Sequence, residues 1–282
     1  MTRWPTCSGR KRPRYPFASL SPRRLFVLPA VAAALAAGYA GAGDRAGSAG
    51  AADEANPCTG PHAGRLRCPD LQMGKPADMY ADRYEGRTVL RATNNLKSRG
   101  EGPVMLRGFR TGKKTMIARQ HIYRVDGSRL VERTGARLHL KYIPGQGPYW
   151  KWADAARFEL WSVDSKGHRQ KLVRTGPKVN YCLRDLKHTA PHKKRSPRTR
   201  VFPKCNQDPG KRSVTLGTSV GWSDVNASTY YEQWIDVTGL RGCFAYVHRA
   251  DPKNHVWENN EGNNDSQRIV RLPWRGPRGG CP

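Results

Sequence analysis

The stretch Thr88-Val-Leu-Arg-Ala-Thr-Asn94 alternates in part between apolar and polar side chains and ends in polar residues. A turn-rich segment, Lys97-Ser-Arg-Gly-Glu-Gly-Pro103, separates it from a second short apolar run, Val104-Met-Leu-Arg107. A period of two places apolar side chains on one face of a strand, and Gly, Pro and Asn are typical of the turns between strands. The stretch therefore predicts a half-buried β-strand that is followed, after a turn, by another strand.

The same pattern recurs along the chain in runs of 4–11 residues that are bounded by Gly, Pro, Asp or Asn. No segment shows a long 3.6-residue period, so we expect few helices. Short strands separated by frequent turns predict an all-β fold of the sandwich type with long loops. The further runs are Thr115–Val125, Leu138–Ile143, Arg157–Val163, Ser213–Leu216, Gln233–Val237 and Phe244–Arg249.

The N-terminal 43 residues contain seven Lys or Arg and no Asp or Glu. A basic start, an apolar run from Leu25 to Ala40 and small residues around Ala40–Ala42 predict a secretory signal peptide. Arg23-Arg24 before Leu25-Phe26-Val27 allows a twin-arginine route as well as the Sec route. An uncleaved anchor is the alternative, but spanning a bilayer takes about 20 strongly apolar residues. We therefore expect a secreted or envelope-associated protein, with no transmembrane segment in the mature chain.

Composition divides the remainder into two parts. Residues 44–57 are mostly Ala, Gly, Asp and Ser, which predicts a flexible tether. Residues 58–282 are long enough for one well-filled core or two small ones, and we expect them to form the folded domain.

The chain is strongly basic, with 50 Lys and Arg against 22 Asp and Glu and a formal net charge of +28. Removal of the seven positive charges in residues 1–43 lowers this net charge to +21. Such an excess favours attraction to polyanions and opposes self-association, although the sequence leaves the oligomeric state open.

The basic residues are most concentrated in Leu186–Lys204, which contains no acidic residue. This segment predicts an exposed loop, which is either only solvated or a contact for anionic surface polymers or acidic proteins. Nucleic acid is disfavoured because aromatic residues do not alternate with the basic ones in a way that suggests base stacking; Phe202, near the end of the segment, is its one Phe, Tyr or Trp. The candidate contacts for a polyanion are Lys187, Lys193, Lys194, Arg195, Arg198 and Arg200.

Six cysteines remain after the signal peptide, which contains Cys7. An even number of cysteines in an exported chain predicts three disulfides, and no Cys-x2-Cys spacing suggests a metal cluster. Six cysteines allow many connectivities. Proximity along the chain favours Cys58–Cys68, then Cys182–Cys205, which leaves Cys243–Cys281 to hold the C-terminus.

Several short blocks occur in a fixed order between Cys68 and about Leu272. They are Cys68-Pro-Asp-Leu71, Ala156-Arg-Phe-Glu-Leu-Trp-Ser162, Lys178-Val-Asn-Tyr-Cys-Leu-Arg-Asp185, Val220-Gly-Trp-Ser-Asp224, Gln233-Trp-Ile-Asp-Val-Thr-Gly239, and Asp251-Pro252 with Glu258 and Asn263-Asn264. In this order they resemble bacterial members of the lysyl oxidase family. The resemblance implies a lysyl oxidase-like β-sandwich. It also implies the family's copper-dependent oxidation of primary amines, including protein lysines, to aldehydes with release of peroxide, which uses a quinone made from one Lys and one Tyr.

The chain departs from the family at both cofactors. The family's copper is bound by a His-x-His-x-His cluster, which should lie just before Ala156, but no histidine lies between His139 and His168. Lys178 matches the family's quinone lysine, whereas the position of the quinone tyrosine holds Asn226, which cannot become a quinone. Tyr230 and Tyr231 lie close by in sequence. Lys178 is thus either a remnant of the catalytic site or an ordinary surface lysine.

We therefore expect an exported lysyl oxidase-like binding module, a pseudoenzyme without copper or quinone. The alternative is a copper-dependent amine oxidase with a rearranged site, which would need both copper and lysine tyrosylquinone. Convergence of the side chains of Gln146–Lys151, Lys178 and Asn226 would indicate a vestigial site.

The Asp, Glu and Asn residues between Asp251 and Asp265 allow two interpretations. They predict a turn or, alternatively, a calcium site.

Overall fold

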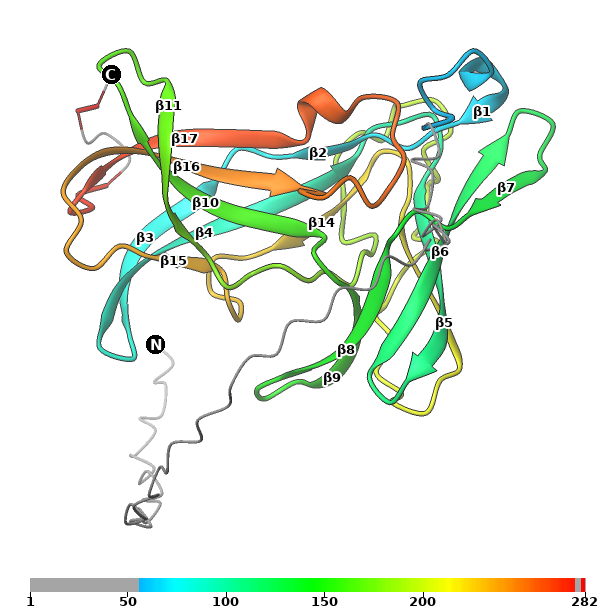
Figure 1. The fold of residues 1–282 in the computed structure, drawn as a ribbon, viewed down its shortest axis with the longest axis horizontal. Coiled ribbons are helices and arrows are strands. Elements are labelled where there is room, and N and C mark those ends of the chain that lie inside the picture. The colour runs from blue at the N-terminus through cyan, green and yellow to red at the C-terminus, as the bar shows by residue number, and fades with distance from the viewer. Residues whose placement is uncertain (1–55, 277–279, 282) are drawn as a thin grey trace, which may run out of the picture. The chain divides into compact units, whose positions relative to one another are not determined.

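Three β-sheets make up the part of the chain that the computed structural model describes, residues 56–276 and 280–281 (Figure 1). The expected signal peptide and residues 44–55 of the expected tether lie outside the described residues. Asn56 and Pro57 were assigned to the tether, but both are half-buried, and the Asn56 amide donates to the Glu258 carbonyl oxygen at 2.9 Å. The folded domain therefore begins at least two residues before Cys58.

The first sheet has seven strands, in the order β13-β5-β6-β8-β9, with β1 and β7 paired to β6. All its pairings are antiparallel, so hairpins and short turns connect β5 to β6 and β8 to β9. Its strands are β1 (Leu66–Arg67), β5 (Val104–Gly112), β6 (Thr115–Arg124), β7 (Arg129–Glu132), β8 (Arg137–Ile143), β9 (Gly147–Trp152) and β13 (Ser213–Thr218).

The second sheet has six strands, with β12-β14-β4-β15 in order and β2 and β3 also paired to β4. The third has four strands, in the order β11-β10-β16-β17. Their bounds are β2 (Leu71–Met73), β3 (Ala77–Tyr84), β4 (Arg87–Ser98), β12 (Lys187–His188), β14 (Trp222–Asn226) and β15 (Trp234–Asp236), then β10 (Ala156–Val163), β11 (Arg169–Thr175), β16 (Gly242–Ala250) and β17 (Asp265–Leu272). The helical elements of the described residues are two short 3-10 turns, η1 (Ala63–Arg65) and η2 (Glu261–Asn263).

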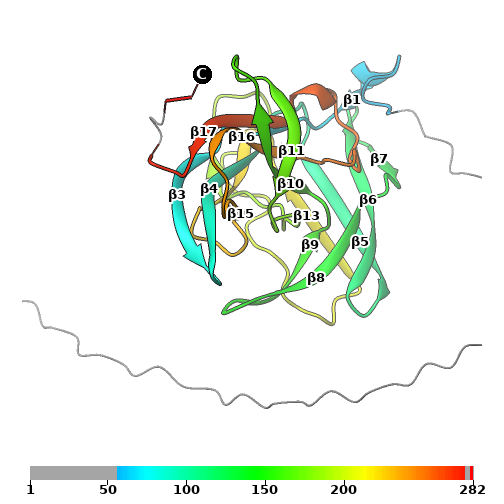
Figure 2. The same cartoon turned by 60° about the vertical axis from the view of Figure 1, so that its left-hand side comes forward.

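Strand β4 joins two cores because it is long and none of its residues is exposed. Its first half places Leu90 and Ala92 against Phe158, Leu160 and other side chains of the four-stranded sheet, which forms a sandwich. In Figure 2 the strands β3 and β4 lie on one side of the domain and β5, β6, β8 and β9 on the other. This sandwich fixes the position of the strand ends that lead into the functional site.

The second half of β4 contributes Leu96 to a larger core beneath the seven-stranded sheet. The largest fully buried side chains there include Trp150 and Trp152 of β9 and Tyr181, which packs between the sheets. Trp152 and Tyr181 also exchange backbone hydrogen bonds of 2.6 and 3.1 Å, which tie β9 to the segment after β11. A smaller cluster forms around Cys58, Cys68 and Ile122.

Three disulfides close the domain, and they are the pairs that proximity along the chain favoured. Cys58–Cys68, Cys182–Cys205 and Cys243–Cys281 have Cα–Cα distances of 5.7, 5.7 and 5.9 Å, within the usual range. Disulfides of this number are typical of proteins in an oxidising, extracellular setting. In the described part of the chain, no helix has the length and apolarity needed to cross a membrane.

The all-β prediction is confirmed, and each run predicted as a strand corresponds to an observed strand. The boundaries differ by one to several residues, and two of these differences matter here. The turn predicted from Lys97 begins after Ser98, because β4 continues through Lys97 and Ser98 to pair with β14 and β2. The predicted strand Gln233–Val237 is shortened to Trp234–Asp236.

Candidate functional site

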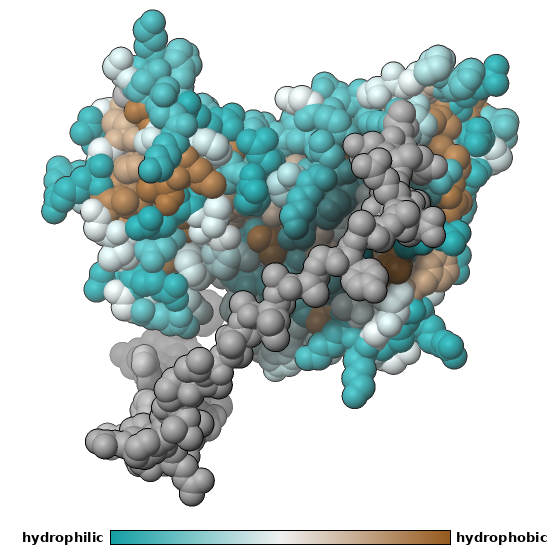
Figure 3. Space-filling view, in the orientation of Figure 1, coloured by the Kyte–Doolittle hydropathy of each residue, from teal (hydrophilic) through white to brown (hydrophobic). Residues whose placement is uncertain are grey.

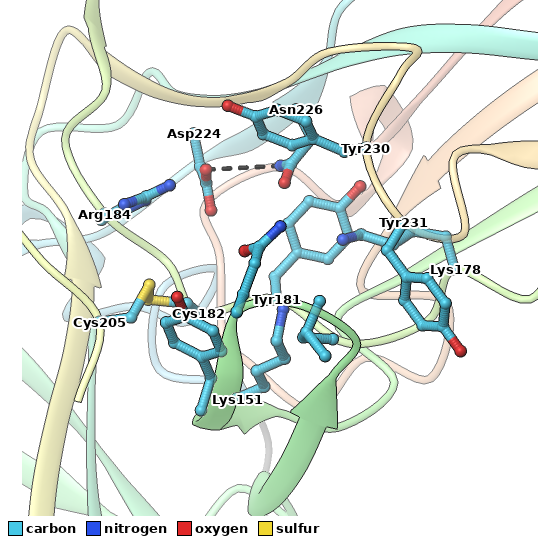
Figure 4. A pocket seen from close by; sticks show the side chains of 13 residues that line it. Lys151, Lys178, Tyr181, Cys182, Arg184, Cys205, Asp224, Asn226, Tyr230 and Tyr231 are labelled. Atoms are coloured by element: carbon cyan, nitrogen blue, oxygen red, sulfur yellow. Dashed lines mark hydrogen bonds between the residues drawn. A yellow bond between two sulfur atoms is a disulfide. The ribbon is translucent and has the colours of Figure 1, made fainter. Parts of the chain in front are cut away.

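A cavity of about 70 Å³ lies where the β8–β9 hairpin, the segment after β11 and the end of β14 meet (Figure 4). The three regions that the resemblance singled out therefore do converge. Gln146, Tyr149 and Lys151 line the cavity together with Lys178 and Asn226. The other lining residues are Ile143, Tyr181, Cys182, Arg184, Cys205, Asp224, Tyr230 and Tyr231.

Strand alternation explains which side chains reach the cavity. Tyr149 and Lys151 of β9 are two residues apart and share one face, whereas Trp150 and Trp152 on the other face are fully buried in the core. Asp224 and Asn226 of β14 share a face in the same way, and the Asn226 amide donates to Asp224 Oδ1 at 3.4 Å. Two strands from different sheets thus each present a pair of polar side chains.

The backbone around Lys178 is held on both sides. Gly176 donates to the Phe158 carbonyl oxygen at 2.9 Å, and a Cβ at this position would lie 2.5 Å from the Trp234 carbonyl oxygen, so only glycine fits. On the other side, the Ala156 N–H donates to the Val179 carbonyl oxygen at 3.3 Å. These contacts fix the direction in which the Lys178 side chain leaves the chain.

The Lys178 side chain is buried, with a residue exposure of 5 %. Its Nζ lies 4.8 Å from the centre of the Tyr181 ring and makes no hydrogen bond or ion pair with any residue that the structure describes. The interpretation of Lys178 as an ordinary surface lysine is therefore wrong. Its neighbours Lys151, Tyr181 and Asp224 come from segments that are distant in sequence, and they enclose it.

Burial and the neighbouring cation Lys151 lower the pKa of Lys178 to about 7, although Asp224 and Glu232 act in the opposite direction. Burial also lowers the pKa of Lys151. The pKa of the Asp224 carboxyl is raised by burial, against the effect of Arg184, Lys178 and Lys151. The lining thus contains three cationic side chains and one carboxylate, so its local charge is positive.

Two exposed tyrosines and an ion pair form the mouth of the cavity. Tyr230 and Tyr231 are 43 % and 38 % exposed and lie in the turn between β14 and β15. Next to them, Glu232 has a φ of 65° and forms an ion pair of 2.6 Å with Lys141 of β8. Because both ends of this pair are largely buried, it fastens the turn over the β8–β9 hairpin.

The donor set of this cavity does not fit copper. Its lining offers one carboxylate, no imidazole, and two cysteines that are joined in a disulfide, whereas imidazole is the ligand that suits Cu(II). Within residues 56–276 and 280–281, no group of three or more His, Cys, Asp and Glu side chains is arranged to hold a metal ion.

The acidic residues between Asp251 and Asp265 are engaged with backbone and amide donors. Asp251 accepts from the N–H groups of His255 and Val256 at 2.9 and 2.7 Å. Glu258 accepts from the Leu71 N–H and from Asn264 Nδ2. These contacts support the turn interpretation, because the carboxylates stabilise the connection between β16 and β17.

The basic segment Leu186–Lys204, the cationic loop, is ordered by buried anchors. Asp185 accepts from the N–H groups of Val201 and Phe202, the His188 ring stacks on Trp222 at 4.4 Å, and Trp222 Nε1 donates to the Pro197 carbonyl oxygen. The cationic side chains remain outside. Lys187, Lys194, Arg195, Arg198 and Arg200 are exposed and Lys193 is partly exposed.

The cationic loop is not part of the cavity. Arg195 forms an ion pair with Glu101, and Arg200 donates to the Leu186 carbonyl oxygen. The Cys182–Cys205 disulfide, which lines the cavity, connects to the end of the loop.

Hydrophilic side chains cover most of the face drawn in Figure 3, and the hydrophobic patches on it are small.

Sequence reasoning identified Lys178 and Asn226 but did not assign Lys151, Tyr181, Arg184 and Asp224 to a site. A signal for these residues was present. Tyr181, Arg184 and Asp224 belong to the blocks that carry the resemblance, and the alternation of Tyr149 and Lys151 with two tryptophans predicts a shared polar face.

Comparison with known protein families gave no match, and comparison with curated proteins found no similar sequence.

Proposed function

We propose that this chain is an exported, lysyl oxidase-like binding protein without amine oxidase activity, and that it attaches to anionic polymers outside the cytoplasm through the cationic loop. The proposal of a lysyl oxidase-like protein without oxidase activity rests on one observation: Lys178 and Asn226 line the same cavity. These are the two positions that the resemblance pairs as the quinone lysine and tyrosine. A shared cavity is what common ancestry would leave behind, and Asn226 cannot supply a quinone.

The second part is supported by the form of the cationic loop. The loop combines exposed Lys and Arg side chains with a backbone that is fixed by Asp185, His188 and Phe202. A surface that is already ordered loses little conformational entropy on binding. With an expected net charge of +21 on the mature chain, long-range attraction would bring anionic polymers to this surface.

Binding to an immobilised acidic cell-wall polymer tests this proposal. We expect K187Q/K194Q/R198Q to lower retention at least about tenfold at low salt, because each phosphate-like contact adds to the salt-dependent affinity. The matched control, K166Q/K171Q/R174Q, removes three exposed cations from the β10–β11 hairpin and should have a much smaller effect. Equal losses in both triple variants would show that net charge, and not the cationic loop, governs binding.

A rearranged copper amine oxidase is the second candidate, and one observation favours it. Tyr230 and Tyr231 line the same cavity as Lys178 and could replace the missing quinone tyrosine. After copper loading, such an enzyme would release peroxide from primary amines and lose this activity in K178M. We expect no amine-dependent peroxide from the unmodified protein, nor from N226Y, because quinone formation first requires the metal.

A further inference from the structure

We propose that Lys178 is a nucleophilic amine that captures small carbonyl compounds bearing a carboxylate, as a reversible imine inside the cavity. The inference goes beyond the proposed function and does not depend on it, because the cationic loop contributes no residue to this chemistry except the disulfide at its end.

The position of Lys178 suits this role. Lys178 is a buried lysine that lines the cavity, and its Nζ has no hydrogen-bond or ion-pair partner among the described residues. An amine that makes no hydrogen bond or ion pair within the protein is available to a ligand in the cavity that it lines. The backbone contacts of Gly176 and Val179 fix the main chain on both sides of Lys178, and Lys178 Nζ lies over the Tyr181 ring, 4.8 Å from its centre.

The protonation state agrees with this geometry. Lys178 has a pKa of about 7, and the groups that set it are burial, Lys151 and Lys141 on one side and Asp224 and Glu232 on the other. About half of the amine is therefore unprotonated at pH 7, whereas an exposed lysine with a pKa of about 10.4 is almost wholly protonated. Only the neutral amine attacks a carbonyl carbon.

The charges of the lining define the ligand class. Lys151 and Arg184 make no ion pair with any described residue. Asp224 is the carboxylate of the cavity lining, and Glu232, which is paired with Lys141, acts on Lys151 and Lys178 from outside the lining. Figure 4 shows Arg184 and Asn226 on either side of Asp224, with Lys151 approaching from the β9 side. Two unpaired cations next to a nucleophilic amine suit a carbonyl compound with an adjacent carboxylate, such as a 2-oxo acid.

The size of the cavity restricts this class further. The cavity volume of about 70 Å³ is several times the roughly 10–15 Å³ that one water molecule needs on the same measure. It accommodates a molecule of only a few heavy atoms, with any longer part of the ligand leaving between the exposed Tyr230 and Tyr231. Glyoxylate is the smallest probe that has both required groups.

The covalent step needs no oxidant or reductant. The Lys178 nitrogen forms a bond to the carbonyl carbon, and the carbonyl oxygen leaves as water with the two hydrogens of the neutral amine. Asp224, whose pKa is raised by burial, is the carboxyl of the cavity lining that would pass a proton to the departing oxygen. Hydrolysis of the imine reverses the step and regenerates the lysine.

Reductive trapping tests the proposal on the purified mature protein. The protein is incubated with glyoxylate and sodium cyanoborohydride at pH 7, and carboxymethylated lysines are located by peptide mass spectrometry. We expect Lys178 to be labelled about a hundredfold faster than the exposed Lys166, because a roughly thousandfold larger neutral fraction is partly offset by lower intrinsic nucleophilicity. The rate at Lys178 should rise through about pH 7 and then level off, whereas Lys166 should continue to gain up to pH 10.

Variants and a second probe separate the parts of the proposal. K178M should abolish the fast labelling, and K166M should leave it unchanged. K151M should reduce labelling by glyoxylate more than labelling by acetaldehyde, which has no carboxylate. Labelling of Lys178 at the rate of exposed lysines in the unmodified protein would overturn the proposal, whether or not K178M folds. A K151M variant with an unchanged ratio of the two probes would refute the carboxylate specificity.

Discussion

At the level of single residues, His248 shows how burial without a partner makes stability depend on pH. Its side chain is fully buried, and its ring packs against Phe158 with centroids 4.0 Å apart and planes tilted by 33°. Both ring nitrogens lack a hydrogen-bond partner among the described residues. Burial lowers the pKa of His248 to about 3. The folded protein therefore keeps this imidazole neutral at pH values where the unfolded chain protonates it.

The sign of the effect follows from the two pKa values. The unfolded histidine, with a pKa of about 6.5, binds a proton that the folded state does not accept until about pH 3, so stability decreases as the pH falls through this range. We expect His248 to contribute a loss of up to about 1.4 kcal/mol in unfolding free energy per pH unit below pH 6. H248F should flatten this slope in thermal melts, and the exposed-residue control H192Q should not. Equal slopes in all three proteins would contradict this interpretation of His248.

Lys178 gives a second prediction at this level. Since its folded pKa of about 7 lies below the unfolded value of about 10.4, the folded state disfavours the charged amine, and stability should rise between pH 7 and pH 10. K178M removes an unpartnered buried amine and should raise the unfolding free energy at pH 7 on the order of 1–3 kcal/mol. Denaturant unfolding measures this. Destabilisation at every pH would show that the amine has a stabilising partner.

At the level of elements, the Cys182–Cys205 disulfide joins the two candidate sites. It lines the cavity and also closes the base of the cationic loop. C182A/C205A should cost roughly 3 kcal/mol of stability, because the bridge restricts the conformational freedom of the unfolded chain. It should also slow carbonyl labelling at Lys178 and weaken polymer retention.

The control for this variant is C243A/C281A, whose disulfide does not line the cavity. It should lose comparable stability but retain labelling and polymer binding. The disulfides can be mapped in the unmodified protein by peptide analysis under non-reducing conditions. Free thiols at any of the six positions would contradict the structure.

Elements also differ in how far the sequence predicts them. β5, β6, β8, β10 and β16 are buried on at least one face, and their alternating or continuous apolar residues indicate a strand. β3 (Ala77–Tyr84) is missed because it pairs only with β4 and contains two Asp and an Arg, so it has no apolar stripe. β14 is missed because its buried residues include the polar Ser223 and Asp224.

The site is less predictable than the fold for a physical reason. The burial of Lys178 depends on Lys151 of β9, Asp224 of β14 and the turn at Glu232, and no local pattern reveals that these segments meet. Taken by its composition, the sequence around Lys178 is that of an exposed turn. The resemblance to the lysyl oxidase family identified the position, and the structure supplied its neighbours.

For the whole molecule, we assign two separate features to one disulfide-bonded, all-β domain. The cationic loop and the net positive charge are proposed to attach it to anionic polymers, and the cavity around Lys178 is proposed to hold a free amine. The absence of amine oxidase activity and the nucleophilic role of Lys178 both require that Lys178 is not cross-linked into a quinone. Attachment to anionic polymers through the cationic loop does not depend on this.

Mass spectrometry of the peptide that contains Lys178, from protein loaded with copper in the presence of oxygen, tests this requirement most directly. We expect an unmodified lysine, with Tyr230 and Tyr231 recovered unmodified in their own peptide. A covalent bond between Lys178 and either tyrosine would contradict both the absence of amine oxidase activity and the free amine, and would favour an amine oxidase with a rearranged site.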